Sequence, residues 1–257
     1  MADNLINYEK KSVVAYYRGQ DKLSLAEEAI LEIVKKEKLE KMIDIGVGAG
    51  RTTAFFAKIF RHYVGIDYSV PMIEAARKRF EDFECCNFYH SDARDMSAFE
   101  NGSFDFVLFS FNGIDCVSYD DRQEILSEIK RIGKPNSYFA FSTHNLYNLD
   151  VLFSFQFPKN PFKYLKEFRR FQGVRKHNPK KEDILKHDFY PMIDGDINFS
   201  AEYLYYKPEK QITELERHGF EEISVFSIKT GKTIQPDVNW SEVNDPWLYF
   251  LCKNSEK

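Results

Sequence analysis

The chain has 257 residues, enough for a sizeable core within one domain, and its formal net charge is -4. It predicts neither a signal peptide nor a membrane span, because no basic start precedes an apolar stretch and no apolar run approaches about 18 residues. The four cysteines have no C-x-x-C spacing and no group of His, Cys and Asp has metal-ligand spacing, so we expect a cytoplasmic protein with reduced thiols and no metal.

The first 40 residues predict a polar-rich helical segment. Residues 5–38 suit helices, with a break around Gly19 to Asp21. A rough helical stripe is formed by Leu23, Leu25, Ile30, Ile33 and Val34. We therefore treat residues 1–40 as a helical segment that precedes the core.

A glycine-rich run, Ile43 to Gly50, lies between an apolar stretch and a helix-like segment, 51–60. Glycine lacks Cβ, so its backbone can adopt a positive φ and approach a ligand closely, and a helix N-terminus presents free N–H groups to that ligand. The dinucleotide pattern G-x-G-x-x-G would need a third glycine at the position of Arg51. Asp44, just before the first glycine, would repel a pyrophosphate and favour a cationic ligand.

Strand-like and helix-like segments alternate through residues 41–144, which we expect to form the ligand-binding core. The strands are expected at 41–46, 63–67, 86–91, 104–110 and 137–143, and the helices at 51–60, 70–80 and 120–132. Such alternation predicts an α/β fold with a mostly parallel, doubly wound sheet, whose ligands bind at the carboxyl ends of the strands.

The alternation stops after His144. Residues 145–206 are too many for a simple connection, and they predict an inserted cap between the fifth strand and the following helix. Inside the cap, Asp194-Gly195 predicts a tight hairpin turn. Residues 207–257 are expected to complete the core with a helix at 208–218 and strands at 223–229 and 247–253.

The glycine run and three later strand ends together resemble the motifs of the class I S-adenosylmethionine-dependent methyltransferase superfamily, of the small-molecule type. The resemblance is good over residues 40–144 and rests on topology alone over 208–252. It implies a Rossmann-like sheet of seven strands, the last one antiparallel, and S-adenosylmethionine as the cofactor. It implies cofactor contacts from Asp44, Gly46, Gly48, Gly50, Asp67, Tyr68, Met72, Asp92, Ala93 and Ser110.

Two acids have separate expected roles in this resemblance. Asp67 ends the second strand, 21 positions after Gly46 and close to the spacing of about 20 found for ribose-binding acids. Asp92 ends the third strand and resembles the acid that holds adenine. In similar small-molecule methyltransferases an N-terminal helix closes over the cofactor, which implies a contact from Tyr17 and Arg18; a tyrosine that only packs on the sheet edge is the alternative.

The fourth and fifth strands are expected to end beside the methyl group. A hydroxyl or a protonated amine must lose a proton during methyl transfer, which requires a positioned base. His144 is our candidate because its ordinary pKa lies near neutrality, and Asp115 is the rival candidate. Asn112 is expected to position the acceptor, and both His144 and Asp115 have a purely structural alternative as a backbone partner or a helix cap.

The expected cap is basic. Residues 159–187 contain ten Lys and Arg against three acids, a net charge of +7 in a chain of net charge -4. Such a surface can attract an anionic acceptor, but it also suits a solvated helix face or contact with a membrane surface.

The sequence therefore predicts a methyltransferase that acts on an oxygen or nitrogen of a small molecule. An RNA or protein methyltransferase that docks through the basic cap is the first alternative, although nucleic acid is the less favoured partner. A cofactor-binding protein without catalysis is the second. The sequence predicts no oligomeric state.

Overall fold

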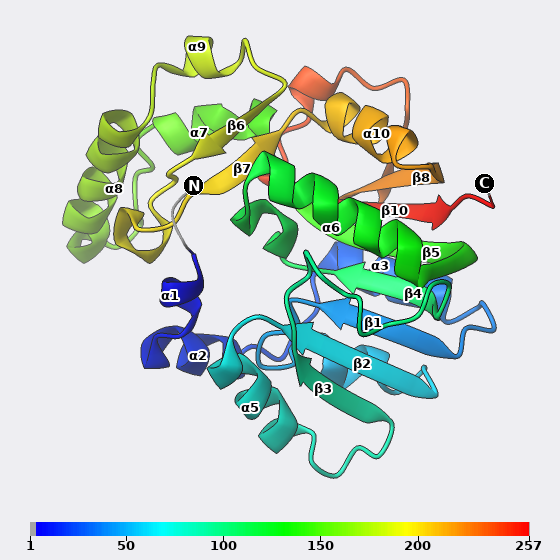
Figure 1. Cartoon of the computed structure of the whole chain (residues 1–257). Helices are drawn as coiled ribbons and strands as arrows, with labels where there is room; N and C mark the ends of the chain where they lie inside the picture. Colours follow the sequence, from blue (N-terminus) through cyan, green and yellow to red (C-terminus); the bar gives the residue numbers. More distant parts are fainter. Residues whose placement is uncertain (1–3, 257) are drawn as a thin grey trace.

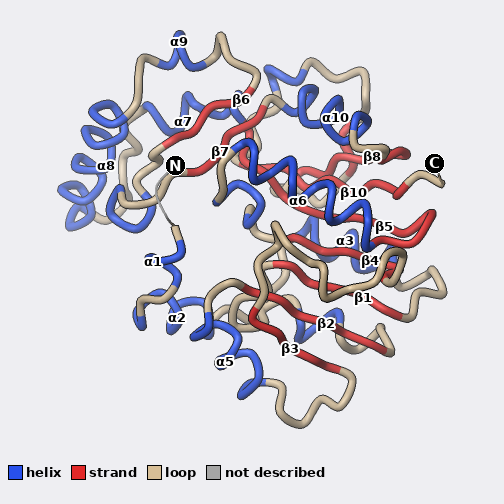
Figure 2. The backbone as a smooth tube through the Cα atoms, viewed as in Figure 1, coloured by secondary structure: helices blue, strands red, loops and turns tan. Residues whose placement is uncertain are grey.

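The protein, described here by a computed structural model that covers residues 4–256, is organised around one mixed β-sheet (Figure 1, Figure 2). The sheet order is β3-β2-β1-β4-β5-β10-β8-β9. These strands are β1 (Lys41–Ile45), β2 (His62–Asp67), β3 (Cys86–His90), β4 (Phe104–Phe109), β5 (Gly133–Asn145), β8 (Phe220–Ser227), β9 (Thr233–Ile234) and β10 (Trp247–Asn254). β1 to β5 pair in parallel, and β10 is antiparallel to both β5 and β8. The doubly wound fold with an antiparallel last strand is confirmed, although three further strands enlarge the sheet to ten.

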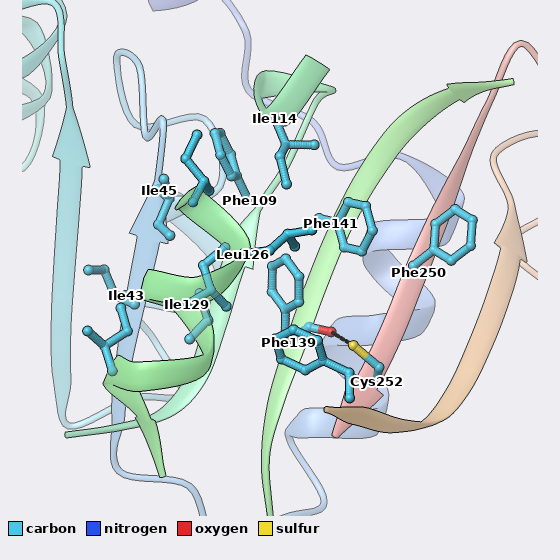
Figure 3. Close-up of a cluster of buried hydrophobic side chains, with 14 of the residues drawn as sticks. Ile43, Ile45, Phe109, Ile114, Leu126, Ile129, Phe139, Phe141, Phe250 and Cys252 are labelled. Atoms are coloured by element: carbon cyan, nitrogen blue, oxygen red, sulfur yellow. Dashed lines mark hydrogen bonds between the residues drawn. The ribbon is translucent and has the colours of Figure 1, made fainter. Parts of the chain in front are cut away.

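The two faces of the sheet bury separate hydrophobic clusters because alternate side chains of a strand point to opposite faces. Ile43, Val107 and Phe250 belong to one cluster, and the neighbouring residues Met42, Leu108 and Tyr249 belong to the other. Figure 3 shows the first cluster, where Leu126 and Ile129 point from a helix toward the aromatic side chains of the strands.

Helices cover both faces. α6 (Tyr119–Ile132) and α10 (Pro208–Arg217) contribute to the first cluster, and α3 (Leu25–Val34), α4 (Thr53–Phe56) and α5 (Val70–Arg79) contribute to the second. The helix expected at 51–60 is much shorter than predicted. Thr52 and Thr53 direct their hydroxyls to buried acceptors beneath the loop, and turns continue the segment to Ile59.

Residues between β5 and α10 form a small subdomain with its own apolar cluster. It contains α7 (Leu149–Phe153), α8 (Tyr164–His177), α9 (Lys181–Ile184), β6 (Phe189–Met192) and β7 (Tyr203–Tyr206). β7 pairs in parallel with the end of β5, at His144 and Asn145, beyond the point where β4 has ended. The β6–β7 hairpin of the cap therefore extends the central sheet.

The β6–β7 hairpin does not have the tight turn expected at Asp194-Gly195. Its connection, residues 193–202, contains three successive left-handed residues, Ile197, Asn198 and Phe199. The Phe199 ring occupies the space that a Cβ on Gly173 of α8 would need. The longer connection therefore forms because it packs onto α8, which the sequence pattern did not indicate.

Two short N-terminal helices, α1 (Leu5–Tyr8) and α2 (Lys11–Arg18), bridge the core and the cap. The Asn4 amide donates to the carbonyls of Cys116 and Glu202 at 2.9 and 3.0 Å. On the core side, Ser69 Oγ donates to the carbonyl of Tyr8 at 3.2 Å. Among the described residues, no helix has the length and apolar composition to cross a membrane.

Candidate functional site

A cavity of about 580 Å³ lies at the carboxyl ends of β1 to β4, a size typical of small-ligand sites. Most residues implied by the family resemblance line it: Tyr17, Asp44, Gly46, Gly48, Asp67, Tyr68, Met72, Asp92, Ala93 and Ser110. Arg18 and Gly50 are not among the lining residues. The strand-end positions in the sequence thus converge on one hollow.

The glycine loop forms the floor of this cavity. Gly46, Gly48 and Gly50 all have positive φ, at 64°, 55° and 81°. A Cβ on Gly48 would meet no protein atom within 4 Å, so this glycine leaves its space to the cavity. A Cβ on Gly50 would lie 2.3 Å from the Phe80 ring, so this glycine leaves room for Phe80 to pack against the loop; the expected contact of Gly50 with the cofactor stays a prediction.

Asp67 is buried at the end of β2 and faces the glycine loop. Its two carboxylate oxygens accept hydrogen bonds from the backbone N–H groups of Gly48, at 2.9 Å, and Ser69, at 2.8 Å. Burial raises the pKa of Asp67 to about 6. Each oxygen keeps a further lone pair, so the side chain is held in place and can still accept two ligand hydroxyls.

Asp44 is buried below the loop and has two hydroxyl partners. Thr52 Oγ1 and the Tyr63 hydroxyl both donate to its Oδ2 at 2.5 Å. Burial raises the pKa of Asp44 to about 6. The carboxylate therefore fastens β1 and β2 to the start of α4 and places negative charge near the cavity, as expected for a cationic ligand.

A buried ion pair that the sequence analysis missed supports the loop. Arg51 lines the cavity and forms hydrogen bonds to both carboxylate oxygens of Glu27, at 2.5 and 2.8 Å. Ser110 Oγ lies 3.1 Å from Arg51 and also contacts Glu27. The available signal was the position of Glu27 on the apolar stripe of the helix, four residues after Leu23 and three before Ile30. This network joins α3, the glycine loop and the end of β4.

Asp92 lies at the far end of the cavity in an ion pair with Arg94. Arg94 Nη2 is 2.6 Å from Asp92 Oδ2, and its Nη1 is 3.2 Å from Asp121. Burial alone would raise the Asp92 pKa, but the hydrogen bonds from Arg94 hold it below the usual value. Asp92, Ala93 and Arg94 all line this end of the cavity, so a polar group of a ligand can reach the Asp92 carboxylate there.

Aromatic side chains line the part of the cavity next to the N-terminal helices and the end of the η1 turn (Gly113–Cys116). Tyr8 and Tyr17 have ring centroids 6.1 Å apart, and the Tyr8 hydroxyl is 3.5 Å from Cys116 Sγ. Burial raises the pKa of the Cys116 thiol to about 12, and it also raises the pKa of both tyrosines. Near neutral pH these groups are therefore uncharged.

The three residues expected to act in catalysis lie together but do not line this cavity. Asp115 is fully buried, and its oxygens accept from Arg122 and Thr143, both at 2.7 Å, and from His144. His144 Nδ1 is 2.8 Å from Asp115, and its Nε2 is 3.2 Å from the Asn112 amide. Because the carboxylate can only accept, Nδ1 is the donor in the contact with Asp115.

The path of β5 explains this placement. The strand continues past β4 and pairs with β7, so its end is covered by the cap and does not stop at the cavity. The His144 ring stacks on Tyr205 with centroids 4.5 Å apart. The expectation that His144 and Asp115 face the methyl group is thereby corrected: they connect β5, α6 and the cap. The expected cofactor contact of Arg18 is also corrected, because this residue is exposed and does not line the cavity.

No group of three or more His, Cys, Asp or Glu within residues 4–256 could hold a metal ion. The cavity instead offers buried acceptors, backbone N–H groups and apolar walls. Such a donor set suits an organic ligand with hydroxyl groups and a positive charge.

Comparisons with known proteins all find similarity to methyltransferases. Residues 42–136 match the model of the "Methyltransferase domain" family. A demethylmenaquinone methyltransferase of Clavibacter sepedonicus is 29% identical over 126 residues, 47% of this chain and 50% of that protein. The chain thus spans about half the length of this curated relative.

Two solved structures share the fold over nearly the whole chain. An S-adenosylmethionine-dependent methyltransferase from Clostridium acetobutylicum has 14% identity and a TM-score of 0.62, covering 98% of this chain and 96% of that one. The 1,6-didemethyltoxoflavin-N1-methyltransferase of Burkholderia thailandensis has 12% identity and a TM-score of 0.60, covering 95% and 85%. At these identities the likeness is one of fold.

Proposed function

We propose that this chain, whose residues 42–136 belong to the class I S-adenosylmethionine-dependent methyltransferase superfamily, transfers the methyl group of S-adenosylmethionine to an oxygen or nitrogen of a small molecule. One observation carries the proposal: buried Asp67, held by the Gly48 and Ser69 N–H groups, faces a glycine loop that leaves its Cβ space to the cavity. This arrangement suits a nucleoside whose ribose hydroxyls donate to a carboxylate.

The lining residues of the cavity support a place for each part of the cofactor. Asp67 would hold the ribose, and Asp92 with Ala93 would hold adenine. Gly46 and Gly48 would lie under the methionine part, with Asp44 supplying negative charge near the sulfonium. The cofactor supplies an electrophilic methyl group, and the chain contributes position, orientation and exclusion of water.

The uncharged wall of the cavity supports an apolar, aromatic acceptor. Tyr8, Tyr17 and Cys116 remain protonated near neutral pH, since burial raises the pKa of each. None of them is a base at that pH. The acceptor is therefore proposed to be nucleophilic as it binds, such as an acidic aromatic hydroxyl or a ring nitrogen.

The names of two relatives agree with a small organic acceptor. One is named for demethylmenaquinone and the other for 1,6-didemethyltoxoflavin. The proposal takes from them only the class of acceptor. We further propose that the protein works in the cytoplasm.

The test measures cofactor binding and methyl transfer separately. Titration calorimetry should show that the chain binds S-adenosylmethionine and S-adenosylhomocysteine. Asp67→Ala should lower both affinities at least tenfold, because hydrogen bonds to a charged group contribute about 1.5–3 kcal/mol. Tighter binding of NAD, or unchanged affinity in Asp67→Ala, would contradict the assignment.

For the transfer step, the chain is incubated with methyl-labelled S-adenosylmethionine and a fractionated cell extract. Label in the organic-soluble small-molecule fraction supports the proposal. Label in RNA or protein would favour a macromolecular acceptor, and tight cofactor binding with no label in any fraction would favour a cofactor-binding protein without catalysis.

A further inference from the structure

We infer that the outer face of α8 and the loop before it form a docking surface for an anionic lipid bilayer. This surface comprises the apolar residues Phe157, Phe162, Leu165 and Phe168 and the basic residues Lys159, Lys163, Lys166, Arg169, Arg175 and Lys176. α8 itself lies on the side of the cap away from the central sheet (Figure 1). The inference does not depend on the proposed function.

The apolar side chains of this docking surface are unusually exposed. Phe162 has 93% of its surface exposed, Phe157 79%, Leu165 60% and Phe168 46%. Single exposed apolar residues are ordinary, but a group of them on adjacent turns marks an interaction site. Exposure of such a group to water is unfavourable, so the group favours a partner that covers it.

The helix turns its other face to the protein. Val174 is fully buried, and Phe171 is half-buried against Phe155 at a centroid distance of 6.1 Å. Arg170 donates to the carbonyls of Leu152 and Ser154 at 2.7 and 2.8 Å. The docking surface is thus the opposite face of a well-anchored helix, available without any unfolding.

Positive charge on this face has no local counter-charge. Glu167, the only acid of α8, is paired inward with Arg170 at 2.7 Å. The other ion pairs made by residues 159–187 join Lys181 to Asp150 and Lys186 to Asp183. Among described residues, the six basic side chains of the docking surface therefore have no carboxylate partner.

The combination of exposed apolar and basic side chains favours an anionic lipid bilayer as the partner. Aromatic and apolar side chains enter the boundary between headgroups and acyl chains, while Lys and Arg on long stems reach anionic headgroups. Each basic residue near such a surface strengthens binding about fivefold, the equivalent of about 1 kcal/mol. A nucleic acid would use the charges but leave exposed Phe162 and Leu165 unexplained.

The test is sedimentation of the full chain with vesicles. We expect binding to vesicles of phosphatidylcholine mixed with phosphatidylglycerol, much weaker binding to phosphatidylcholine alone, and release at high salt. Equal binding to both vesicles, or none to either, overturns the inference. Neither result changes cofactor binding, which is measured without lipid, so a failure here is distinguishable from a failure of the proposed function.

Two variants and a matched control sharpen the test. The apolar variant carries Phe157→Ser, Phe162→Ser, Leu165→Ser and Phe168→Ser, and the basic variant carries Lys159→Gln, Lys163→Gln, Lys166→Gln and Arg169→Gln. The control changes exposed residues elsewhere: Val70→Ser, Tyr89→Ser, Lys36→Gln, Lys38→Gln and Lys78→Gln. Each test variant should lose at least tenfold in vesicle affinity, and the control less than twofold.

Because the altered side chains are exposed, all variants should keep the wild-type melting temperature and affinity for S-adenosylmethionine. Wild-type affinity in the apolar variant would show that the aromatic residues do not enter lipid. Concentration-dependent dimerisation that this variant abolishes would assign the surface to a second copy. Tighter binding to single-stranded RNA than to anionic vesicles would assign it to nucleic acid.

Discussion

Arg51 and Glu27 form a two-pronged, buried ion pair beneath the glycine loop, with Nη2 2.5 Å from Oε1 and Nη1 2.8 Å from Oε2. Glu27 also accepts from the backbone N–H of Ser24 at 2.7 Å, so it begins α3 while it holds the loop. The position that excludes a dinucleotide fingerprint is thus the position that anchors the loop to the rest of the fold.

Removing one partner of this pair should destabilise the protein strongly. Glu27→Gln leaves the Arg51 charge buried and uncompensated, which costs roughly 3–5 kcal/mol. The double variant Glu27→Gln/Arg51→Met should cost less than the sum of the single changes. Urea unfolding measures both, and additive losses would show that the pair is not coupled.

The pair also predicts a dependence on pH. Burial alone would raise the Glu27 pKa, but the Arg51 hydrogen bonds hold it below its ordinary value of 4.5. The stabilisation is therefore complete above pH 4.5 and is lost as the pH falls through the lower pKa of the folded chain. Wild type should lose stability in that acid range, while the double variant should not show this part of the loss.

Asp67 should change the stability with pH in the opposite direction to Glu27. Its pKa of about 6 lies above the ordinary 3.8, so the folded chain holds the proton more tightly than the unfolded chain. Between pH 4 and pH 7 the stability of wild type relative to Asp67→Asn should fall by up to about 3 kcal/mol. Urea unfolding at several pH values checks this, and a rising difference would show that the carboxylate is not buried.

Gly48→Ala and Gly50→Ala should distinguish an effect on cofactor binding from an effect on stability. A methyl group at Gly48 enters open space, so it should cost only about 1–2 kcal/mol for the left-handed backbone, yet weaken S-adenosylmethionine binding at least tenfold. A methyl at Gly50 would collide with Phe80 and should cost more stability. Calorimetry and thermal melting distinguish them; equal cofactor affinity in Gly48→Ala and wild type would place the ligand elsewhere.

His144→Ala should reduce stability more than catalysis. The ring lies outside the cavity lining and supports the contact between β5, Tyr205 and Asp115. We expect kcat to fall less than tenfold with an unchanged pH profile, whereas a catalytic base would cost about 10²–10⁴. A loss of that size, with the pH dependence of kcat removed, would restore His144 as the base.

The strand-end motifs were predictable because they depend on local rules. Asp44, Gly48 and Asp67 occupy fixed offsets from strands whose apolar runs are easily recognised, and the parallel sheet brings them to one edge. The doubly wound order and the antiparallel β10 followed from the same pattern and the family resemblance.

The roles of His144 and Asp115 could not be predicted from local rules, because they depend on what covers the end of β5. That strand continues past β4 because β7 and β10, both far later in the chain, pair with its end. Arg122 is likewise an exposed-looking helical residue in the sequence, yet it is fully buried against Asp115 and Glu214. Such long-range partners leave no periodic trace in one sequence.

The pairing of β7 with β5 limits which part of the protein can open to let the cavity exchange its contents. A cap joined to the sheet by hydrogen bonds, at His144 and Asn145, cannot swing away without breaking the sheet. The N-terminal helices are attached by side-chain hydrogen bonds, such as those from Asn4 and Ser69, and by no strand pairing among the described residues. We therefore expect local opening of α1 and α2, which needs far less free energy than unfolding the sheet, to limit how quickly product leaves.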